Sequence, residues 1–399
     1  MRHTVFISEL EAWLVEEAMS DPDIRTLFGE VCDRLHGIGV AVKRAALSWP
    51  TLHPLFRAEQ VSWKLGKGAE HTQFRHESGS NAAWLASPFY YVASRNVPRL
   101  RRRLIGTNAL IDFPVLEDLK GQGYTDYLVT MSHFKIAEFQ SYADGETGII
   151  STWATMRQEG FSDDDLEALS RIQRMLALAC HSAIQKQVMT NLANTYLGPT
   201  ASWRVLSGSI QRGSGKYINA VVWYSDLRDS THLSETMESE DYLGLLNDYY
   251  ECTAGPVTDH GGEILNFIGD GVLAIFPVKG NAGLGKAAAA ASAAVSETLD
   301  LKAKKKSCAS RGHLPLEFGV ALAVGDVMFG NIGIPQRLAF SGIGPIVNRV
   351  NRVEQATKKL NSSVLATGEF AAAAPGDWRS VGPVPLRGVD EEIELFAPV

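Results

Sequence analysis

The sequence is poor in cysteine and has no long hydrophobic segment. Its cysteines, Cys32, Cys180, Cys252 and Cys308, are scattered and show none of the paired spacing typical of zinc sites or redox motifs. No apolar run approaches the roughly 20 residues that cross a bilayer. Acidic residues also interrupt the N-terminal segment, where a signal peptide would be apolar. We therefore expect reduced cysteines, no membrane span and a cytoplasmic protein.

The composition, with 45% hydrophobic and 21% charged residues, is that of a globular protein and excludes a largely disordered chain. A length of 399 residues predicts two domains. The net charge of −7 argues against binding to nucleic acid. One local exception is the basic run RLRRR at 99–103, which is either a solvated face or a site for an anion or a partner.

Residues 1–160 mix short β-rich runs, such as 124–131 and 148–155, with amphipathic helical segments, which predicts an α+β domain. A long helix then starts at Ser162, with Asp165 three residues later as in a helix N-terminal cap. Its apolar stripe either packs on its own domain or pairs two protomers. Gly198 and Pro199 end the helix, so residues 161–215 form a linker between the domains.

Aromatic residues are dense in the first domain. They either pack in its core or line a pocket for a flat ligand: Trp49, Trp63, Trp84, Phe89, Tyr90 and Tyr91. We expect this domain to regulate the second one through an unidentified small-molecule effector.

Residues 216–399 alternate strands and helices. A buried strand at 217–226 precedes a helix near 231–251, and an Asp-Gly turn at 269–271 joins the strands 263–268 and 272–276. A helix near 282–302, strands near 316–323 and 338–343, and a helix near 346–359 follow.

Two aspartates in this domain are candidate metal ligands. Asp226 ends the first strand and Asp270 occupies the hairpin turn, so central pairing of the strands would bring both carboxylates to one sheet edge. Two carboxylates can hold two magnesium ions, and the backbone amides of 227–231, where a helix opens, can cradle phosphates. An Asp-Gly turn also occurs without any function.

Three segments in order resemble class III adenylate and guanylate cyclases: SDLRDST at 225–231, NFIGDG at 266–271 and FSGIGPIVNRVNR at 340–352. The resemblance covers roughly 200–399 and implies a ferredoxin-like domain that forms a head-to-tail homodimer with active sites at the interface. The implied reaction turns ATP into cyclic AMP and pyrophosphate with two Mg²⁺ or Mn²⁺ per site. The first domain is similar in length and pattern to a GAF-type sensor.

The resemblance assigns roles to individual residues. Asp226 and Asp270 would bind the metals on one protomer, and Leu227, Ser230 and Thr231 would bind the phosphates. From the other protomer, Asn348 would orient the ribose and Arg352 would stabilise charge on the α-phosphate. Arg387 would grip the terminal phosphates.

The sequence departs from the family at the residues that select the base and at one arginine. Asn266 and Ser341 stand where a lysine and an aspartate or threonine usually select adenine; we expect them to bind adenine, although a flipped amide would accept from guanine. Glu317 occupies the place of a family arginine. A guanylate cyclase, or a catalytically weak nucleotide-binding regulator on the same fold, is therefore the alternative.

The segment 280–286, GNAGLGK, nearly spells a phosphate-binding P-loop. Ala287 follows it where the motif requires Ser or Thr for magnesium, so we interpret the segment as an ordinary helix start.

Overall fold

The chain forms two compact units, Met1–Tyr196 and Leu197–Val399. The computed structural model describes residues 4–76, 81–136, 148–280, 283–309, 316–388 and 391–399. Within these ranges, no helix combines the length and the apolar character needed to cross a membrane.

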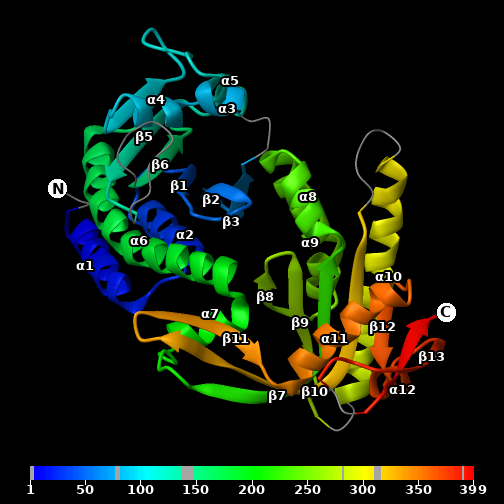
Figure 1. Ribbon diagram of the computed structural model, residues 1–399. Helices are drawn as coiled ribbons and strands as arrows, with labels where there is room; N and C mark the ends of the chain where they lie inside the picture. Colours follow the sequence, from blue (N-terminus) through cyan, green and yellow to red (C-terminus); the bar gives the residue numbers. More distant parts are fainter. Residues whose placement is uncertain (1–3, 77–80, 137–147, 281–282, 310–315, 389–390) are drawn as a thin grey trace. The chain divides into compact units, whose positions relative to one another are not determined.

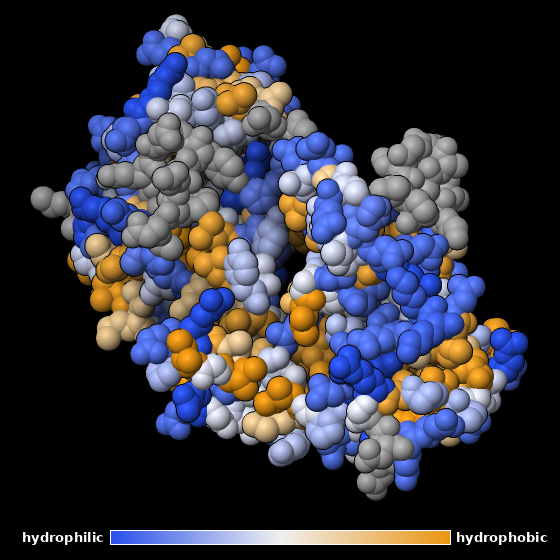
Figure 2. All heavy atoms as spheres, viewed as in Figure 1, coloured by the Kyte–Doolittle hydropathy of each residue, from blue (hydrophilic) through white to orange (hydrophobic). Residues whose placement is uncertain are grey.

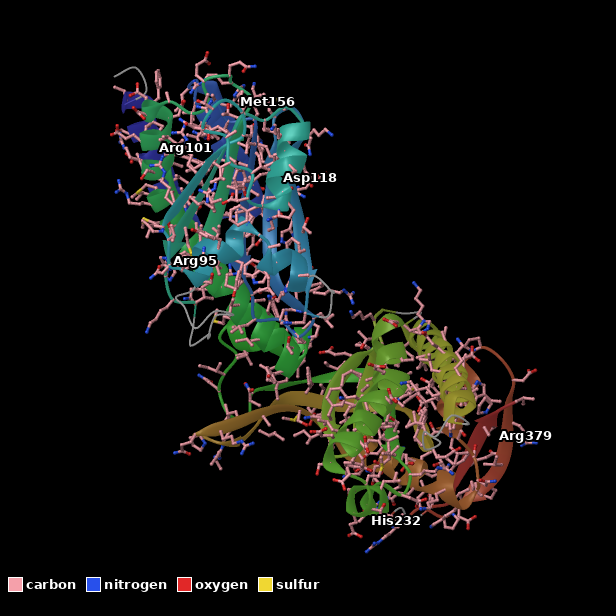
Figure 3. All side chains as sticks on the ribbon, turned by 90° about the horizontal axis from the view of Figure 1, so that it is seen from above. Arg95, Arg101, Asp118, Met156, His232 and Arg379 are labelled. Carbon is pink, nitrogen blue, oxygen red and sulfur yellow. The ribbon has the colours of Figure 1, made fainter. Side chains whose placement is uncertain are left out.

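Unit 1 is built on a six-stranded antiparallel sheet in the order β3-β2-β1-β6-β5-β4 (Figure 1). Its strands are β1 (Arg44–Pro50), β2 (Phe56–Lys64), β3 (Gly68–Arg75), β4 (Arg99–Arg103), β5 (Asp126–His133) and β6 (Gly148–Thr155). The last two confirm the strands predicted near 124–131 and 148–155. Arg101, labelled in Figure 3, belongs to β4 at one edge of this sheet.

Helices cover both faces of this sheet. One face packs on α1 (Thr4–Ser20), α2 (Ile24–Gly37) and α6 (Asp163–Leu197), and the other on α4 (Pro88–Ser94) and α5 (Pro114–Gly121). The short helix α3 (Asn81–Leu85) contacts α4. The apolar stripe of α6 is buried in the first of these cores, so packing within its own unit is the correct interpretation of that stripe. The aromatic residues are divided between the two faces and do not line one pocket: Trp49 and Trp63 lie on the α6 side, whereas Phe89 and Tyr91 lie on the other.

The ends of α6 follow the predicted signals. The Asp165 backbone N–H donates to Ser162 Oγ at 3.2 Å, and the Ser162 backbone N–H donates back to Asp165 Oδ2 at 2.8 Å, which is a reciprocal N-terminal cap. The helix ends at Leu197, before Gly198 with φ of 78°. A single helix of 35 residues therefore leads from the sheet of unit 1 to the start of unit 2.

Unit 2 has an eight-stranded sheet in the order β13-β14-β12-β10-β7-β9-β8, with β11 paired to β10. Its strands are β7 (Gly215–Leu227), β8 (Glu263–Ile268), β9 (Gly271–Pro277), β10 (Phe318–Ile334), β11 (Arg337–Ile343), β12 (Val364–Thr367), β13 (Trp378–Val384) and β14 (Ile393–Pro398). In the part β10-β7-β9-β8, the unit's first strand, β7, lies between its fourth strand, β10, and its third strand, β9. This order, with all three pairings antiparallel, is the predicted ferredoxin-like arrangement.

The helices of unit 2 are α7 (Pro199–Leu206), α8 (Ser230–Thr236), α9 (Ser239–Asp259), α10 (Gly283–Ala309), α11 (Pro345–Lys359) and α12 (Gly368–Ala373). Helices α9 and α10 pack on one face of the sheet, and α11 packs on the other. The prediction of one helix over 231–251 is wrong, because the extended backbone of Met237 (ψ of 152°) separates α8 from α9. Residues 281–282 of the P-loop-like segment, and the side chain of Cys308, lie outside the described residues.

Candidate active site

Asp226 and Asp270 meet at one edge of the unit 2 sheet. The buried strand β7 ends next to Asp226, which pairs in register with Gly271 at the start of β9. The Leu227 backbone N–H donates to the Asp270 carbonyl at 3.3 Å, and the Tyr250 hydroxyl donates to the carbonyl of Gly269 in the same turn. Central pairing of β7 with β9 thus produces the juxtaposition that the sequence predicts.

Asp226 lies in an unfavourable environment for negative charge. Burial, followed by repulsion from Asp270 and Glu354, raises the pKa of Asp226 to about 7. Burial, with the Asp226 charge as the next cause, raises the pKa of the neighbouring Tyr224 to about 12. The charged side chains that act on Asp226 are therefore the two other carboxylates, Asp270 and Glu354.

Glu354 is a third carboxylate of this site, and sequence reasoning missed it. It lies on α11, is 7% exposed, and has a pKa raised to about 7, chiefly by burial. A Cβ added at Gly319 of β10 would lie 2.4 Å from Glu354 Oε1, so glycine is required there for this close approach. One sequence signal could have revealed Glu354. It lies among the apolar residues Ile346, Val350 and Val353, which form the buried stripe of α11.

The donor set fits a hard divalent cation. Carboxylate oxygens are the ligands that Mg²⁺ and Mn²⁺ prefer, and a cation would relieve the repulsion between Asp226 and Asp270. In the described parts of the chain, no group of three or more His, Cys, Asp or Glu side chains is arranged to hold a metal. Water and substrate phosphates would therefore complete the coordination, as is usual for Mg²⁺.

The predicted phosphate cradle at 227–231 is only partly available, which corrects the role given to Leu227. Its backbone N–H is engaged by the Asp270 carbonyl, and the Arg228 N–H donates to the Glu317 carbonyl at 2.9 Å. Ser230 and Thr231 are the first residues of α8. His232, which follows them, projects from the surface of unit 2 in Figure 3. These two hydroxyl residues, and not the Leu227 amide, remain candidates for phosphate binding.

Asn266 and Ser341 are in direct contact, although 75 residues separate them. Asn266 lies on β8 and Ser341 on β11, and the Ser341 hydroxyl donates to Asn266 Oδ1 at 2.7 Å. This hydrogen bond occupies the amide oxygen and leaves the amide N–H₂ group to donate. The two predicted base-selecting residues therefore form one hydrogen-bonded pair.

Asn348 and Arg352 lie on the accessible side of α11, opposite its buried residues. Arg352 Nη1 donates to Gln355 Oε1 at 3.2 Å, and the Asn348 side chain is exposed. Arg387 is exposed after β13, the edge strand that carries Arg379 in Figure 3. All three side chains are thus accessible to a ligand or to another protomer.

Residues 214–394 match the family described as the adenylate and guanylate cyclase catalytic domain. A terminal-differentiation-specific adenylate cyclase of Dictyostelium discoideum is 30% identical over 181 residues, which are 44% of this chain and 8% of that protein. An adenylate cyclase of Anabaena cylindrica is 29% identical over 195 residues, 47% of this chain and 38% of that protein. The adenylyl cyclase CyaB from P. aeruginosa, a crystal structure, is 26% identical with a TM-score of 0.41, covering 47% of this chain and 96% of that one. This chain spans less than two fifths of the length of either curated relative.

Proposed function

We propose that the protein converts ATP to 3′,5′-cyclic AMP and pyrophosphate, because residues 214–394 match the adenylate and guanylate cyclase catalytic domain. The observation that carries the proposal is the meeting of the Asp226 and Asp270 carboxylates at the end of the central strand. The reaction forms a bond from the ribose 3′-oxygen to the α-phosphorus and breaks the bond from that phosphorus to pyrophosphate.

Two Mg²⁺ or Mn²⁺ ions, bound by Asp226 and Asp270, would increase the acidity of the 3′-hydroxyl and neutralise the triphosphate. The protein then supplies position and charge. Ser230 and Thr231 bind phosphate oxygens, and Arg387 contacts the terminal phosphates. From a second protomer, Asn348 orients the ribose and Arg352 stabilises the charge that develops at the α-phosphate.

The Asn266–Ser341 pair supports ATP over GTP. With its proton donated to Asn266 Oδ1, Ser341 Oγ keeps lone pairs that accept from the exocyclic amine of adenine. The free amide N–H₂ of Asn266 donates to adenine N1. Guanine in the same position would place its N1–H against the amide donor and its O6 against the Ser341 oxygen, so both contacts would be mismatched.

We propose a homodimer because Asn348 and Arg352 are accessible and because large apolar side chains are exposed on other elements of unit 2. Trp203 is 70% exposed, Tyr217 71% and Ile334 59%. Figure 2 shows hydrophobic side chains on the surface of α7 and β11 in unit 2. Exposed apolar side chains that gather in this way mark protein interfaces. Unit 1 is the proposed regulatory domain.

The test is to incubate the full chain with Mn²⁺ and either ATP or GTP and to quantify cyclic nucleotides by chromatography. Asp226→Ala serves as the blank. Cyclic AMP from ATP, absent with Asp226→Ala, is the expected result. Cyclic GMP alone would assign the domain to guanylate cyclases, and no product from either nucleotide would favour the nonenzymatic regulator.

The variant Ser341→Ala tests the base contact. It frees the Asn266 amide to rotate, so we expect the ratio of kcat/KM for ATP over GTP to fall by about 10-fold, the usual effect of one hydrogen bond. Ser341→Thr retains the hydroxyl and is the matched control. An unchanged ratio in Ser341→Ala would remove the pair from base selection.

A further inference from the structure

Unit 1 contains a cavity of about 620 Å³ on the sheet face that α2 and α6 cover. Its walls come from β1, β2 and β3, from the start of α2 and from the segment 183–191 of α6. This volume lies within the roughly 300 to 1,000 Å³ typical of small-molecule sites. The cavity is a distinct feature of unit 1 and shares no residue with the catalytic domain.

Polar and aromatic side chains of three adjacent strands meet at this cavity. Trp49 of β1 pairs directly with Glu59 of β2, and His71 of β3 lies diagonal to Glu59 because it pairs with Val61. The Trp49 and His71 rings stack with centroids 6.2 Å apart. Residues at these register positions share one face of a sheet, so the three side chains form one cluster.

Glu59 is the unusual member of the cluster, since it is 1% exposed on an otherwise apolar face. Gln187 Nε2 of α6 lies 2.9 Å from Glu59 Oε1 and 2.8 Å from Oε2, and His71 Nε2 lies 2.8 Å from Oε2. A carboxylate has about four acceptor positions, so these contacts leave one on Oε1. The ionic partner of Glu59 is His71, which carries a positive charge only when it is protonated; among the described residues, no lysine or arginine forms an ion pair with Glu59.

A buried carboxylate is costly unless it is paired with a cation and fully hydrogen-bonded. The cations at the cavity do not meet this need. Lys186 forms an ion pair with Asp21, and the exposed Arg25 lies beside the carboxylate of Asp23, which caps α2 through the Thr26 N–H at 2.8 Å. The cluster is therefore incomplete as it stands.

We propose that this cavity binds a small organic cation, an amine or amidine, whose N–H groups donate to Glu59. Such a group supplies a permanent positive charge, which His71 provides only when protonated, and it supplies the donor for the open position on Oε1. Arginine-like planar cations bind carboxylates through two parallel hydrogen bonds, so an amidinium fits this chemistry well.

The ligand would also act on α6. Gln187, which holds Glu59, and Lys186, Thr190 and Asn191, which line the cavity, all belong to this helix, and α6 ends where unit 2 begins. A ligand that contacts Gln187 therefore changes the free energy of the helix that connects the units. This regulatory consequence rests on the proposed cyclase function, whereas the binding site itself does not.

The test uses benzamidine as the probe and benzoate, a planar molecule of similar shape and opposite charge, as its control. Binding to the full chain is measured by thermal shift and by isothermal titration calorimetry. We expect benzamidine at millimolar concentration to raise the melting temperature by about 2 to 4 °C. Benzoate should produce no shift.

Glu59→Gln should abolish the benzamidine shift. Glu70→Gln, the same change on an exposed residue adjacent to His71 in β3, should retain it. Thr190→Met places a larger side chain of α6 in the cavity and keeps Glu59, so it should also abolish binding. Because this variant does not change Glu59, it shows whether the loss in Glu59→Gln reflects a folding defect. A benzamidine shift that persists in both variants, a stronger shift with benzoate, or no shift with the wild-type protein would overturn the proposal. Because thermal shift needs no turnover, a failure of this site is distinguishable from a failure of the cyclase assignment.

Discussion

In unit 1, two buried aspartates are matched by arginines, whereas in unit 2 the buried Glu354 and the half-buried Asp226 and Asp270 lie beside one another. Asp126 is fully buried and accepts from Arg101 Nη2 at 2.6 Å and from the Phe161 N–H at 2.9 Å. Asp226, by contrast, has Asp270 and Glu354 as its charged neighbours, and its pKa is raised to about 7.

The difference separates structural carboxylates from functional ones. An aspartate that is paired within the fold contributes to stability and has no capacity left for a ligand. The carboxylates at the end of β7 reduce the stability of the isolated chain, and a divalent cation would remove that cost. By the same criterion we place Glu59 of unit 1 with the functional carboxylates, because its ionic partner, His71, is charged only when protonated, and none of the described lysines or arginines pairs with it.

The largest expected effect is the loss of turnover on removing a carboxylate from unit 2. Asp270→Ala should lower kcat by roughly 10³-fold, the upper range for losing one group that stabilises transition-state charge. The measurement is cyclic AMP formation with Mn²⁺ and ATP, with Asp300→Ala on the exposed face of α10 as the control. If the variant merely weakens nucleotide binding and the wild type has no turnover, the domain is a regulator.

The second effect concerns the paired aspartate of unit 1. Asp126→Asn leaves Arg101 without its buried partner and should reduce the free energy of unfolding by about 3 kcal/mol. Hydrogen–deuterium exchange of peptides from β5 and β6 would report this loss. The control is Asp112→Asn, whose ion pair with Arg102 is more exposed and should cost less than about 1 kcal/mol. Equal losses in both variants would contradict the distinction between these pairs.

The third effect is a pH dependence that belongs to unit 1. Burial opposes the charge of Asp165, but hydrogen bonds from Ser162 and the ion pair with Arg157 outweigh it and lower its pKa. A lowered carboxyl pKa stabilises the fold above the unfolded value of about 3.9, and the benefit disappears as pH falls through the folded value. The difference in melting temperature between the wild type and Asp165→Asn should therefore be constant from pH 5 to 8 and shrink below about pH 4. A difference that does not change with pH would show that the charge of Asp165 contributes nothing.

The smallest expected effect is an increase in the free energy of unfolding, whereas Asp126→Asn should decrease it. Asp226→Asn removes one of the clustered negative charges and should raise the free energy of unfolding by roughly 1 kcal/mol in the presence of a chelator. With Mn²⁺ added, the wild type should gain stability and the variant should not, so the order reverses. Melting curves with and without Mn²⁺ test this, and a variant less stable than the wild type in both conditions would sink the idea.

Local sequence signals were sufficient for much of this fold and site. The Asp-Gly turn located the hairpin and Asp270, and Ser162 with Asp165 located the start of α6. Glu354 was missed because its role depends on which face of α11 packs beside Gly319, a contact across 35 residues of sequence. The engagement of the Leu227 N–H and the break at Met237 were missed for a similar reason, since neither position carries a glycine or proline to signal it.

The continuity of α6 has a mechanical consequence. The eleven residues from Gln187 to Leu197 extend over ten helical rises of 1.5 Å, or about 15 Å. Gly198, with a φ of 78°, then ends α6, and Pro199 starts α7. If unit 1 regulates unit 2 as proposed, a change at Gln187 must pass along this stretch of α6 and through the backbone of Gly198 to reach the next helix.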